Sequence, residues 1–275
     1  MDPRLFYSKI PTTISKSPVP GDSPVNERRP GVEVASQAEF GERRGTMHLV
    51  HLWEAQGHPA KKYGMTPSAD MTGKSCTQSQ ATDWYFCASA HVARILAGIF
   101  SVCFPKFYQL YRKAFDAGVW LTSDPGPWLG RAVVFKLQVY PHRDGLDGGP
   151  CASVPVGYFT GGEALLLDLD AKLAQGSRSY LPGDILIFMS GALYHRISEW
   201  FPAPVPPELA SKGITSGRVS TVFFFPEASL QALEGKPPLW GKRTMGGKVC
   251  DALDFSHVTA QSARKTSRKQ KLGRS

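Results

Sequence analysis

The chain has 275 residues, of which 42% are hydrophobic and 11% aromatic, and its net charge is +9 at pH 7. This profile is typical of a globular protein with one sizeable core and does not require two domains. We expect no stretch apolar enough to form a membrane helix, and the N-terminal residues lack the apolar core of a secretion signal. Five cysteines without framework spacing favour free thiols in a reducing compartment. These features predict an intracellular protein, cytoplasmic or nuclear, with no membrane partner.

The positive charge is concentrated at the C-terminal end. Of the net +9, residues 261–275 carry +6 and residues 1–46 carry +1, which leaves +2 for residues 47–260. Residues 256–275 therefore read as a basic tail. We expect this tail to be disordered; it can bind nucleic acid weakly, act as a nuclear address, or be no more than a solvated end, and the sequence leaves these roles open.

The N-terminal half predicts a disordered segment followed by helices. Residues 1–46 are rich in Pro, Ser, Gly and charged residues and have no apolar period, so we expect disorder there. One domain is expected over residues 47–255, with a first strand at 47–53. Residues 83–100 predict a helix capped by Asp83, with one apolar face made of Trp84, Ala88, Val92, Ile95 and Ile99. A second helix is expected from Pro105 to Ala117.

From Arg131 onward the pattern changes to short strands. The segments are RAVVFKLQVY, SVPVGYF, EALLLDL, SRSYL, DILIFM, LYHRIS and RVSTVFFF, and Gly, Pro or Asp separates them. Strands that follow two helices predict an α+β fold in which the strands close a sandwich or barrel. The strand-rich core is expected over about residues 130–226.

Three residues in the middle of the chain form a candidate metal site. His142 and Asp144 lie two apart in YPHRDG, so an extended chain points both side chains to the same side. His195 follows in ALYHRIS, with enough chain between to cross a barrel and return. Two imidazoles and one carboxylate are the ligands that hold non-haem Fe(II) on one face and leave positions open. The alternative is a surface HxD turn with an unrelated core histidine.

The motifs PHRDG, YFTGGEALLLDL, YLPGDILIFMSG, YHRIS and GRVSTVFFFP resemble, in that order, the pattern of the Fe(II)/2-oxoglutarate-dependent dioxygenase superfamily. The resemblance covers roughly residues 130–226, and within the superfamily the chain is most similar to fungal members of the Tet/J-binding-protein-like group. It implies a double-stranded β-helix (jelly-roll) core with the N-terminal helices packed on it. It implies that His142, Asp144 and His195 bind iron and that Arg218, with Ser220 on the same face, binds 2-oxoglutarate. A planar guanidinium suits bidentate binding of a carboxylate.

The resemblance also implies the reaction, in which 2-oxoglutarate and O₂ are used to oxidise an unidentified organic substrate, with succinate and CO₂ as co-products. Three alternatives stay open: oxidation of a nucleic-acid base, a catalytically inactive jelly-roll binding protein, and a cupin-like metal enzyme that does not use 2-oxoglutarate. The Pro-rich insert between His195 and Arg218 makes that spacing longer than in many relatives. By strand parity, Lys136, Gln138 and Tyr140 either line the cavity beside His142 or face outward.

Other groupings point to structural roles. His48, His51 and His58 have unremarkable spacing and are expected to be packing residues rather than a second metal site. Cys87 and His91 share a helix face, but without a CxxC partner we expect a core histidine beside a buried thiol. Ser190, in FMSGALYH, lacks the surroundings of a hydrolase nucleophile.

Overall fold

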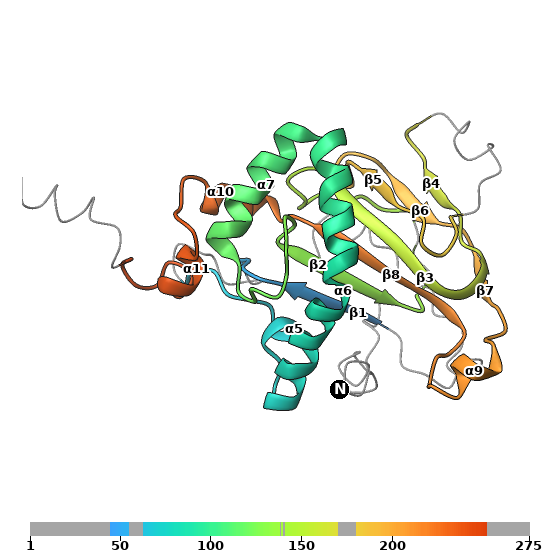
Figure 1. Ribbon diagram of the computed structural model, residues 1–275. Coiled ribbons are helices and arrows are strands. Elements are labelled where there is room, and N and C mark those ends of the chain that lie inside the picture. Colours follow the sequence, from blue (N-terminus) through green and yellow to red (C-terminus); the bar gives the residue numbers. More distant parts are fainter. Residues whose placement is uncertain (1–44, 55–62, 138, 140, 170–179, 252–275) are drawn as a thin grey trace, which may run out of the picture.

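The computed structural model describes residues 45–251 except 55–62, 138, 140 and 170–179, and these residues form antiparallel sheets with helices packed on them (Figure 1). The larger sheet contains, in spatial order, β1 (Gly45–Val50), β2 (Gly130–Phe135), β8 (Gly217–Phe224), β3 (Cys151–Gly161) and β5 (Leu186–Phe188), while β7 (Trp200–Pro202) also pairs with β3. A separate pair joins β4 (Ala164–Leu166) to β6 (His195–Ile197). This arrangement confirms the α+β class, and closure into a jelly roll stays a prediction.

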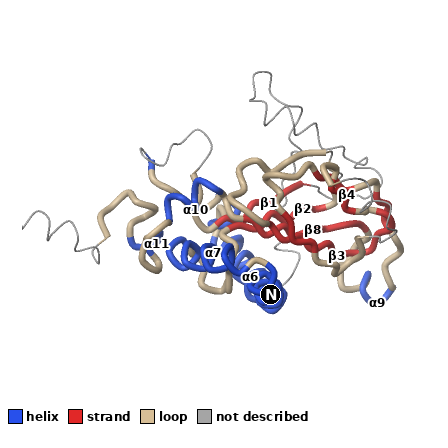
Figure 2. Tube along the Cα trace, turned by 90° about the horizontal axis from the view of Figure 1, so that it is seen from above, coloured by secondary structure: helices blue, strands red, loops and turns tan. Residues whose placement is uncertain are grey.

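The helices cover one face of the larger sheet, and β4 lies on the opposite side (Figure 2). Two long helices, α6 (Cys76–Cys103) and α7 (Pro105–Gly118), bury aromatic and small side chains against the strands, which places the main core between helices and sheet. Shorter helices complete the domain: α5 (Ala69–Thr72), α9 (Pro207–Ala210), α10 (Glu227–Leu233) and α11 (Trp240–Arg243).

Strand alternation gives the two faces of the larger sheet different roles. On β8, Val219 and Phe223 pack in the cores on the helix side, and Thr221 Oγ1 lies 3.2 Å from the hydroxyl of Tyr85 on α6. Successive strand residues point to opposite faces, so Arg218 and Ser220 face away from the helices. The shared role expected for these two residues in binding stays a prediction.

A buried polar network ties the helix side together. His51 Nδ1 accepts hydrogen bonds from the backbone N–H groups of Trp120 and Leu121, so the ring proton is on Nε2, which donates to Asp124 Oδ2 at 3.0 Å. The other oxygen of Asp124 accepts from Arg131 Nη2 at 2.5 Å. His51 is therefore a satisfied core histidine, as expected; the charged partners around it carried no sequence signal.

Helix α6 departs from prediction at its start and in its orientation. It begins at Cys76, where Ser75 caps it by accepting from Gln78 N–H, so Asp83 is not the cap. The expected apolar face is largely turned to solvent, with Ile95 58% and Ile99 37% exposed. The buried face is instead Ala81, Phe86, Ala90, Ala93, Leu96 and Phe100. The helix is apolar on both faces, so periodicity alone could not choose between them.

Three further expectations need correction. Cys87 and His91 are both exposed on α6 rather than buried together. Strand β2 ends at Phe135, and Lys136 has a φ of 53°, which breaks the parity expected to continue to Tyr140. Helix α6 is also long and apolar enough to cross a membrane, by length and composition only, contrary to the expectation for the chain. A core helix of a soluble protein can meet the same test.

Several expectations concern residues outside the described part of the chain. These include the disordered segment through residue 44, the basic tail from residue 256, His58, Gln138, Tyr140 and most of the strand expected at 177–181. Strand β1 begins at Gly45, two residues before the expected start of the domain. Helix α7 lies where the second helix is expected and ends one residue later, at Gly118.

Candidate metal centre

Backbone pairing brings the two halves of the candidate metal site together. His142 and His195 form an isolated antiparallel bridge, in which the N–H of each donates to the carbonyl of the other at 2.9 Å. His195 is the first residue of β6, while His142 precedes the loop that carries Asp144. Residues 53 positions apart therefore become direct neighbours.

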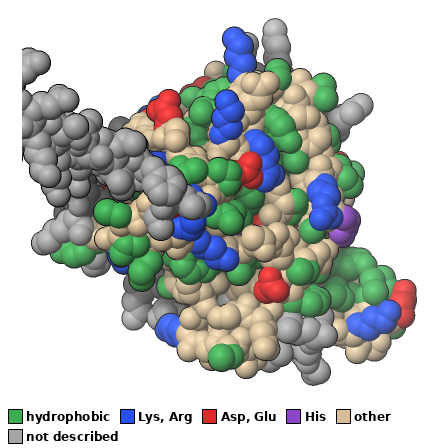
Figure 3. Space-filling model, turned by 60° about the vertical axis from the view of Figure 1, so that its left-hand side comes forward, with side chains coloured by type: hydrophobic (Ala, Val, Ile, Leu, Met, Phe, Trp, Pro, Cys, Tyr) green, Lys and Arg blue, Asp and Glu red, His purple; other side chains and the backbone are tan. Residues whose placement is uncertain are grey.

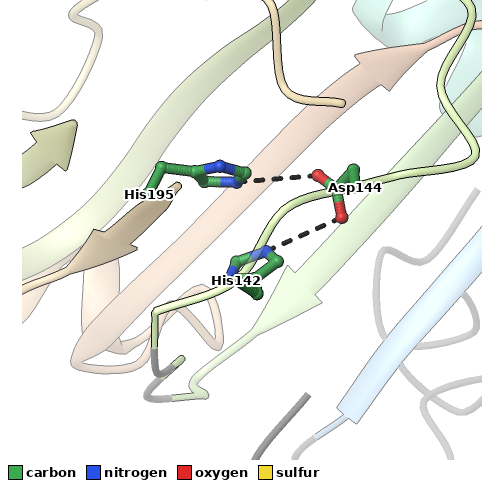
Figure 4. Close-up of side chains that lie close together, drawn as sticks. All are labelled: His142, Asp144 and His195. Carbon is green, nitrogen blue, oxygen red and sulfur yellow. Dashed lines mark ion pairs between the residues drawn. The ribbon is translucent and has the colours of Figure 1, made fainter. Parts of the chain in front are cut away.

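The three side chains point toward one another (Figure 4). Asp144 Oδ1 lies 3.7 Å from His142 Nε2, and Asp144 Oδ2 lies 3.6 Å from His195 Nε2. One ligand atom from each residue lies within 4.8 Å of the other two. The side chains are 14–27% exposed, so an ion can reach them from solvent. The cluster has the residue types and the spacing to hold one metal ion, as the sequence predicted.

The ring of His195 is oriented for this use. Its Nδ1 lies 3.0 Å from the carbonyl oxygen of Leu193, which can only accept, so Nδ1 carries the proton and Nε2 keeps its lone pair. The ring of Phe188 packs edge-on against it, with centroids 4.8 Å apart. A hydrogen bond from the second ring nitrogen is the usual way in which proteins fix a ligating histidine.

Two hydrogen bonds with the turn before β6 hold the loop that carries Asp144. The N–H of Asp144 donates to the carbonyl of Ser190 at 3.0 Å, and Ser190 Oγ donates to Asp147 Oδ2 at 2.6 Å. Ser190 is fully buried, which agrees with the expectation that it is no exposed nucleophile. A Cβ added to Gly191 would lie 3.0 Å from the carbonyl oxygen of Asp147, so the two segments are in close contact.

Arg218 forms the second feature of this side of the sheet. It is 4% exposed, and its buried Nε and Nη2 atoms have no hydrogen-bond partner among the described residues. The rings of Tyr180 and Phe159 lie 5.6 Å and 5.7 Å from its guanidinium carbon. Desolvation by burial lowers the pKa of Arg218 to about 10, which leaves the group charged at neutral pH. A buried cation with free donors is suited to bind an anion.

Ser220 and its neighbours complete the wall beside Arg218. Ser220 Oγ lies 3.1 Å from Ser153 Oγ on β3, and the hydroxyl of Tyr180 donates to the carbonyl of Ser153 at 2.5 Å. Lys136, expected either to line the cavity or to face outward, is 2% exposed and donates from Nζ to Thr215 Oγ1 at 2.9 Å. Its ammonium is therefore engaged at the end of β2 by the loop before β8.

The structure thus groups His142, Asp144 and His195, and places Arg218 and Ser220 on the face turned away from the helices. Sequence reasoning missed Tyr180, Phe159 and the Leu193 carbonyl. Tyr180 is the first residue of the YLPGDILIFMSG motif, and Phe159 is the second residue of YFTGGEALLLDL. No sequence signal distinguishes a ring that flanks an arginine from one that fills a core.

Comparisons with known proteins add little to this geometry. No family model and no curated protein matches the chain. Among solved structures, that of OsALKBH1 is similar with a TM-score of 0.29 and 19% sequence identity, over 48% of this chain and 63% of that chain. This chain therefore spans less than two thirds of that structure. A similarity this low carries no argument about fold or activity, so the functional argument rests on the side chains themselves.

Proposed function

We propose that this protein is an Fe(II)- and 2-oxoglutarate-dependent dioxygenase that oxidises an organic substrate. The observation that carries the proposal is the His142–Asp144–His195 cluster, whose ligand atoms lie within 4.8 Å of one another. Two neutral imidazoles and one carboxylate, with no thiolate, suit Fe(II) and leave coordination positions open. Arg218 is buried, and two of its donor atoms have no partner in the part of the chain that the structure describes, which supports 2-oxoglutarate as the second ligand.

The chain's residues divide the work at this site. The Leu193 carbonyl holds the His195 proton on Nδ1, so Nε2 is available to a metal. Asp144 adds one negative charge, and the bridge between His142 and His195 fixes the two rings at a centroid distance of 4.2 Å. Bound Fe(II) would supply the activation of O₂, with 2-oxoglutarate converted to succinate and CO₂ while an oxygen atom passes to the substrate.

Arg218 would bind the carboxylate of 2-oxoglutarate that lies away from the metal. Its planar guanidinium can donate two parallel hydrogen bonds to a carboxylate, which a lysine cannot do. The rings of Tyr180 and Phe159 flank the guanidinium and exclude water, which strengthens the charge-assisted bonds. Ser220, on the same face and two residues further along β8, offers a hydroxyl beside that carboxylate.

The test is anaerobic binding of Fe(II) and 2-oxoglutarate, followed by measurement of succinate formation in air. We expect Asp144→Ala to lose metal binding and turnover while its free energy of unfolding stays within about 1 kcal/mol of wild type, since the carboxylate is partly exposed and lies outside the packed core. Asp184→Ala is the matched control, because Asp184 is an exposed carboxylate whose contact is the N–H of Leu181. Retained metal binding in Asp144→Ala would contradict the ligand assignment.

The same assay separates the alternatives. Metal binding that 2-oxoglutarate does not affect would favour a cupin-like metal enzyme. Binding of both ligands without succinate formation under any condition would favour an inactive binding protein. Oxidation of a nucleic-acid base remains a narrower form of the proposal, and it requires that a labelled duplex or single strand stimulates succinate formation.

A further inference from the structure

The outer side of α6 exposes a row of large apolar side chains. Ile95 is 58% exposed, Ile99 37% and Val102 80%. Their spacing of four and three residues places them on one face of the helix, one turn apart. Leu110 on the neighbouring α7 is 41% exposed as well. We call this surface, made of Ile95, Ile99, Val102 and Leu110, the outer apolar face.

This exposure is unusual for such a helix. A helix that is apolar all round is normally buried, either in a protein core or in a membrane. Helix α6 has the length and composition of a membrane-crossing helix, yet only 28% of its most apolar window is buried inside the protein. A contiguous exposed apolar surface marks an interaction site more often than chance exposure of single residues does. The outer apolar face is therefore a candidate interaction surface.

The charged residues of α6 and α7 between Trp84 and Phe115 all have one sign. Residues 84–115 contain Arg94, Lys106, Arg112 and Lys113 and no acidic residue. Arg94, Lys106 and Lys113 are exposed. Figure 3 shows Lys and Arg side chains among exposed hydrophobic ones on one side of the molecule, with Asp and Glu side chains there as well. The acids at either end of this stretch are engaged. Asp83 accepts a hydrogen bond from Ser123, and Asp116 pairs with Arg112.

The exposed apolar side chains and the basic residues together indicate which kind of partner binds this face. A second copy of the chain would bring the same basic surface against itself, because a two-fold contact pairs like with like. Nucleic acid would use the basic residues but would leave the isoleucines without an apolar partner. An anionic lipid surface satisfies both features, since apolar side chains enter the acyl boundary while Lys and Arg bind the headgroups.

We propose that the outer apolar face of α6 and α7 docks on an anionic membrane surface, with α6 lying in the plane of the interface. This inference does not depend on the metal site. It also predicts an orientation. The helices cover one face of the large sheet and β4 lies on the other, so the candidate metal centre, which includes β6 beside β4, faces away from the lipid (Figure 2).

The experiment is co-sedimentation of the full-length protein with vesicles of phosphatidylcholine alone or with phosphatidylserine. We expect binding to the phosphatidylserine vesicles and a loss of about tenfold or more in Ile95→Asn/Ile99→Asn, from the apolar area withdrawn. Phe201→Asn/Ile214→Asn is the matched control, since these side chains are exposed by 56% and 39% on β7 and the loop after α9. The control should bind as wild type, and circular dichroism verifies folding of each variant.

A charge variant tests the second half of the argument. Lys106→Gln/Lys113→Gln should weaken binding to phosphatidylserine vesicles by roughly fivefold for each lysine and leave binding to neutral vesicles unchanged. The basic tail is present in all variants, so its attraction cancels in these ratios.

Three results would overturn the proposal. The first is a wild-type protein that binds neither vesicle. The second is an Ile95→Asn/Ile99→Asn variant that binds as wild type. The third is a wild-type dimer, seen by analytical ultracentrifugation, that the same variant converts to a monomer, which would assign the face to contact between copies.

Discussion

The molecule buries two arginines on opposite faces of the same sheet, and they have different surroundings. Arg131, 1% exposed, donates to Asp124 Oδ1 at 2.5 Å and to Ser89 Oγ at 2.8 Å. Arg218, 4% exposed, has aromatic rings beside it, but among the described residues no carboxylate pairs with it. Within the described part of the chain, both guanidinium groups have a buried donor without a hydrogen-bond partner, but only Arg131 pairs with a carboxylate.

Burial of an unpaired charge is expensive, so a protein keeps one where a ligand completes it. The Arg131 network joins His51, β2 and the loop after α7, although Nε of Arg131 has no hydrogen-bond partner among the described residues. Arg218 lies on the side of the sheet that carries the metal-type cluster, where an anion would supply the missing partner. The two arginines therefore differ in whether a carboxylate pairs with them, since burial alone does not distinguish them, and anion binding by Arg218 stays a proposal.

The largest expected effect on the free energy of unfolding comes from removing the carboxylate that pairs with Arg131. Asp124→Ala leaves a buried guanidinium unpaired and removes the acceptor of His51, so unfolding free energy should fall by about 3–5 kcal/mol. Arg218→Met, which replaces an unpaired cation by an apolar side chain of similar length, should leave stability unchanged or higher. Urea unfolding of both variants measures this. A larger loss in Arg218→Met than in Asp124→Ala would reverse the assignment of roles.

Acid should weaken the same network. Burial alone would raise the pKa of Asp124, but the Arg131 charge and the hydrogen bonds from His51 and Gly126 lower it to about 2, from 3.8. Because the folded-state pKa is the lower one, this stabilisation is present above about pH 4 and is lost as the pH falls toward 2. The loss should reach about 2 kcal/mol. The difference in unfolding free energy between wild type and Asp124→Asn should shrink over this range, and a difference that stays constant with pH would contradict the expectation.

Local sequence pattern predicted the candidate site far better than it predicted this network. His142 and Asp144 are two apart, and strand alternation put Arg218 and Ser220 on one face, so short-range geometry was enough. For His195 the sequence predicted only that the intervening chain is long enough to return to His142, and the bridge between the two residues is seen in the structure alone. His51 and Asp124, in contrast, are 73 residues apart and lie in segments without a distinctive motif. Only the packed structure brings them together.

For the helices, too, the sequence pattern predicted only part of the structure. The existence of α6 and α7 was evident from apolar spacing, but α6 has apolar residues all round, so its inner face was misassigned. The strand expected through Tyr140 ends at Phe135, because Lys136 takes a left-handed backbone conformation. No neighbouring residue in the sequence predicts that conformation. Tertiary contacts determine which face of a helix is buried and where a strand ends, and the local sequence pattern does not encode those contacts.

Substitution of Arg218 should weaken the binding of 2-oxoglutarate rather than destabilise the fold. Arg218→Ala should weaken 2-oxoglutarate binding roughly 10–100-fold, since a buried charge-assisted pair contributes about 1.5–3 kcal/mol. Arg218→Lys should recover only part of this, because lysine lacks the planar fork. Isothermal titration under anaerobic conditions, with metal affinity measured in parallel, gives both quantities. An unchanged dissociation constant in Arg218→Ala would move the carboxylate anchor to another residue.

The smallest expected effect on stability is that of replacing either of two buried serines, one near the metal-type cluster and one remote from it. Ser190 and Ser229 are both fully buried and each donates one hydrogen bond, the first to Asp147 Oδ2 at 2.6 Å and the second to the Leu52 carbonyl at 2.9 Å. Replacing either by alanine should reduce unfolding free energy by about 1 kcal/mol, since one acceptor loses its donor.

Only Ser190 supports the metal-type cluster, because its carbonyl accepts from the N–H of Asp144 and its hydroxyl holds Asp147 in the same loop. Ser190→Ala should therefore weaken Co(II) binding by about tenfold and alter the Co(II) absorption spectrum, whereas Ser229→Ala should change neither. Equal metal affinity in the two variants, at equal loss of stability, would show that the loop keeps Asp144 in place without the Ser190 hydroxyl.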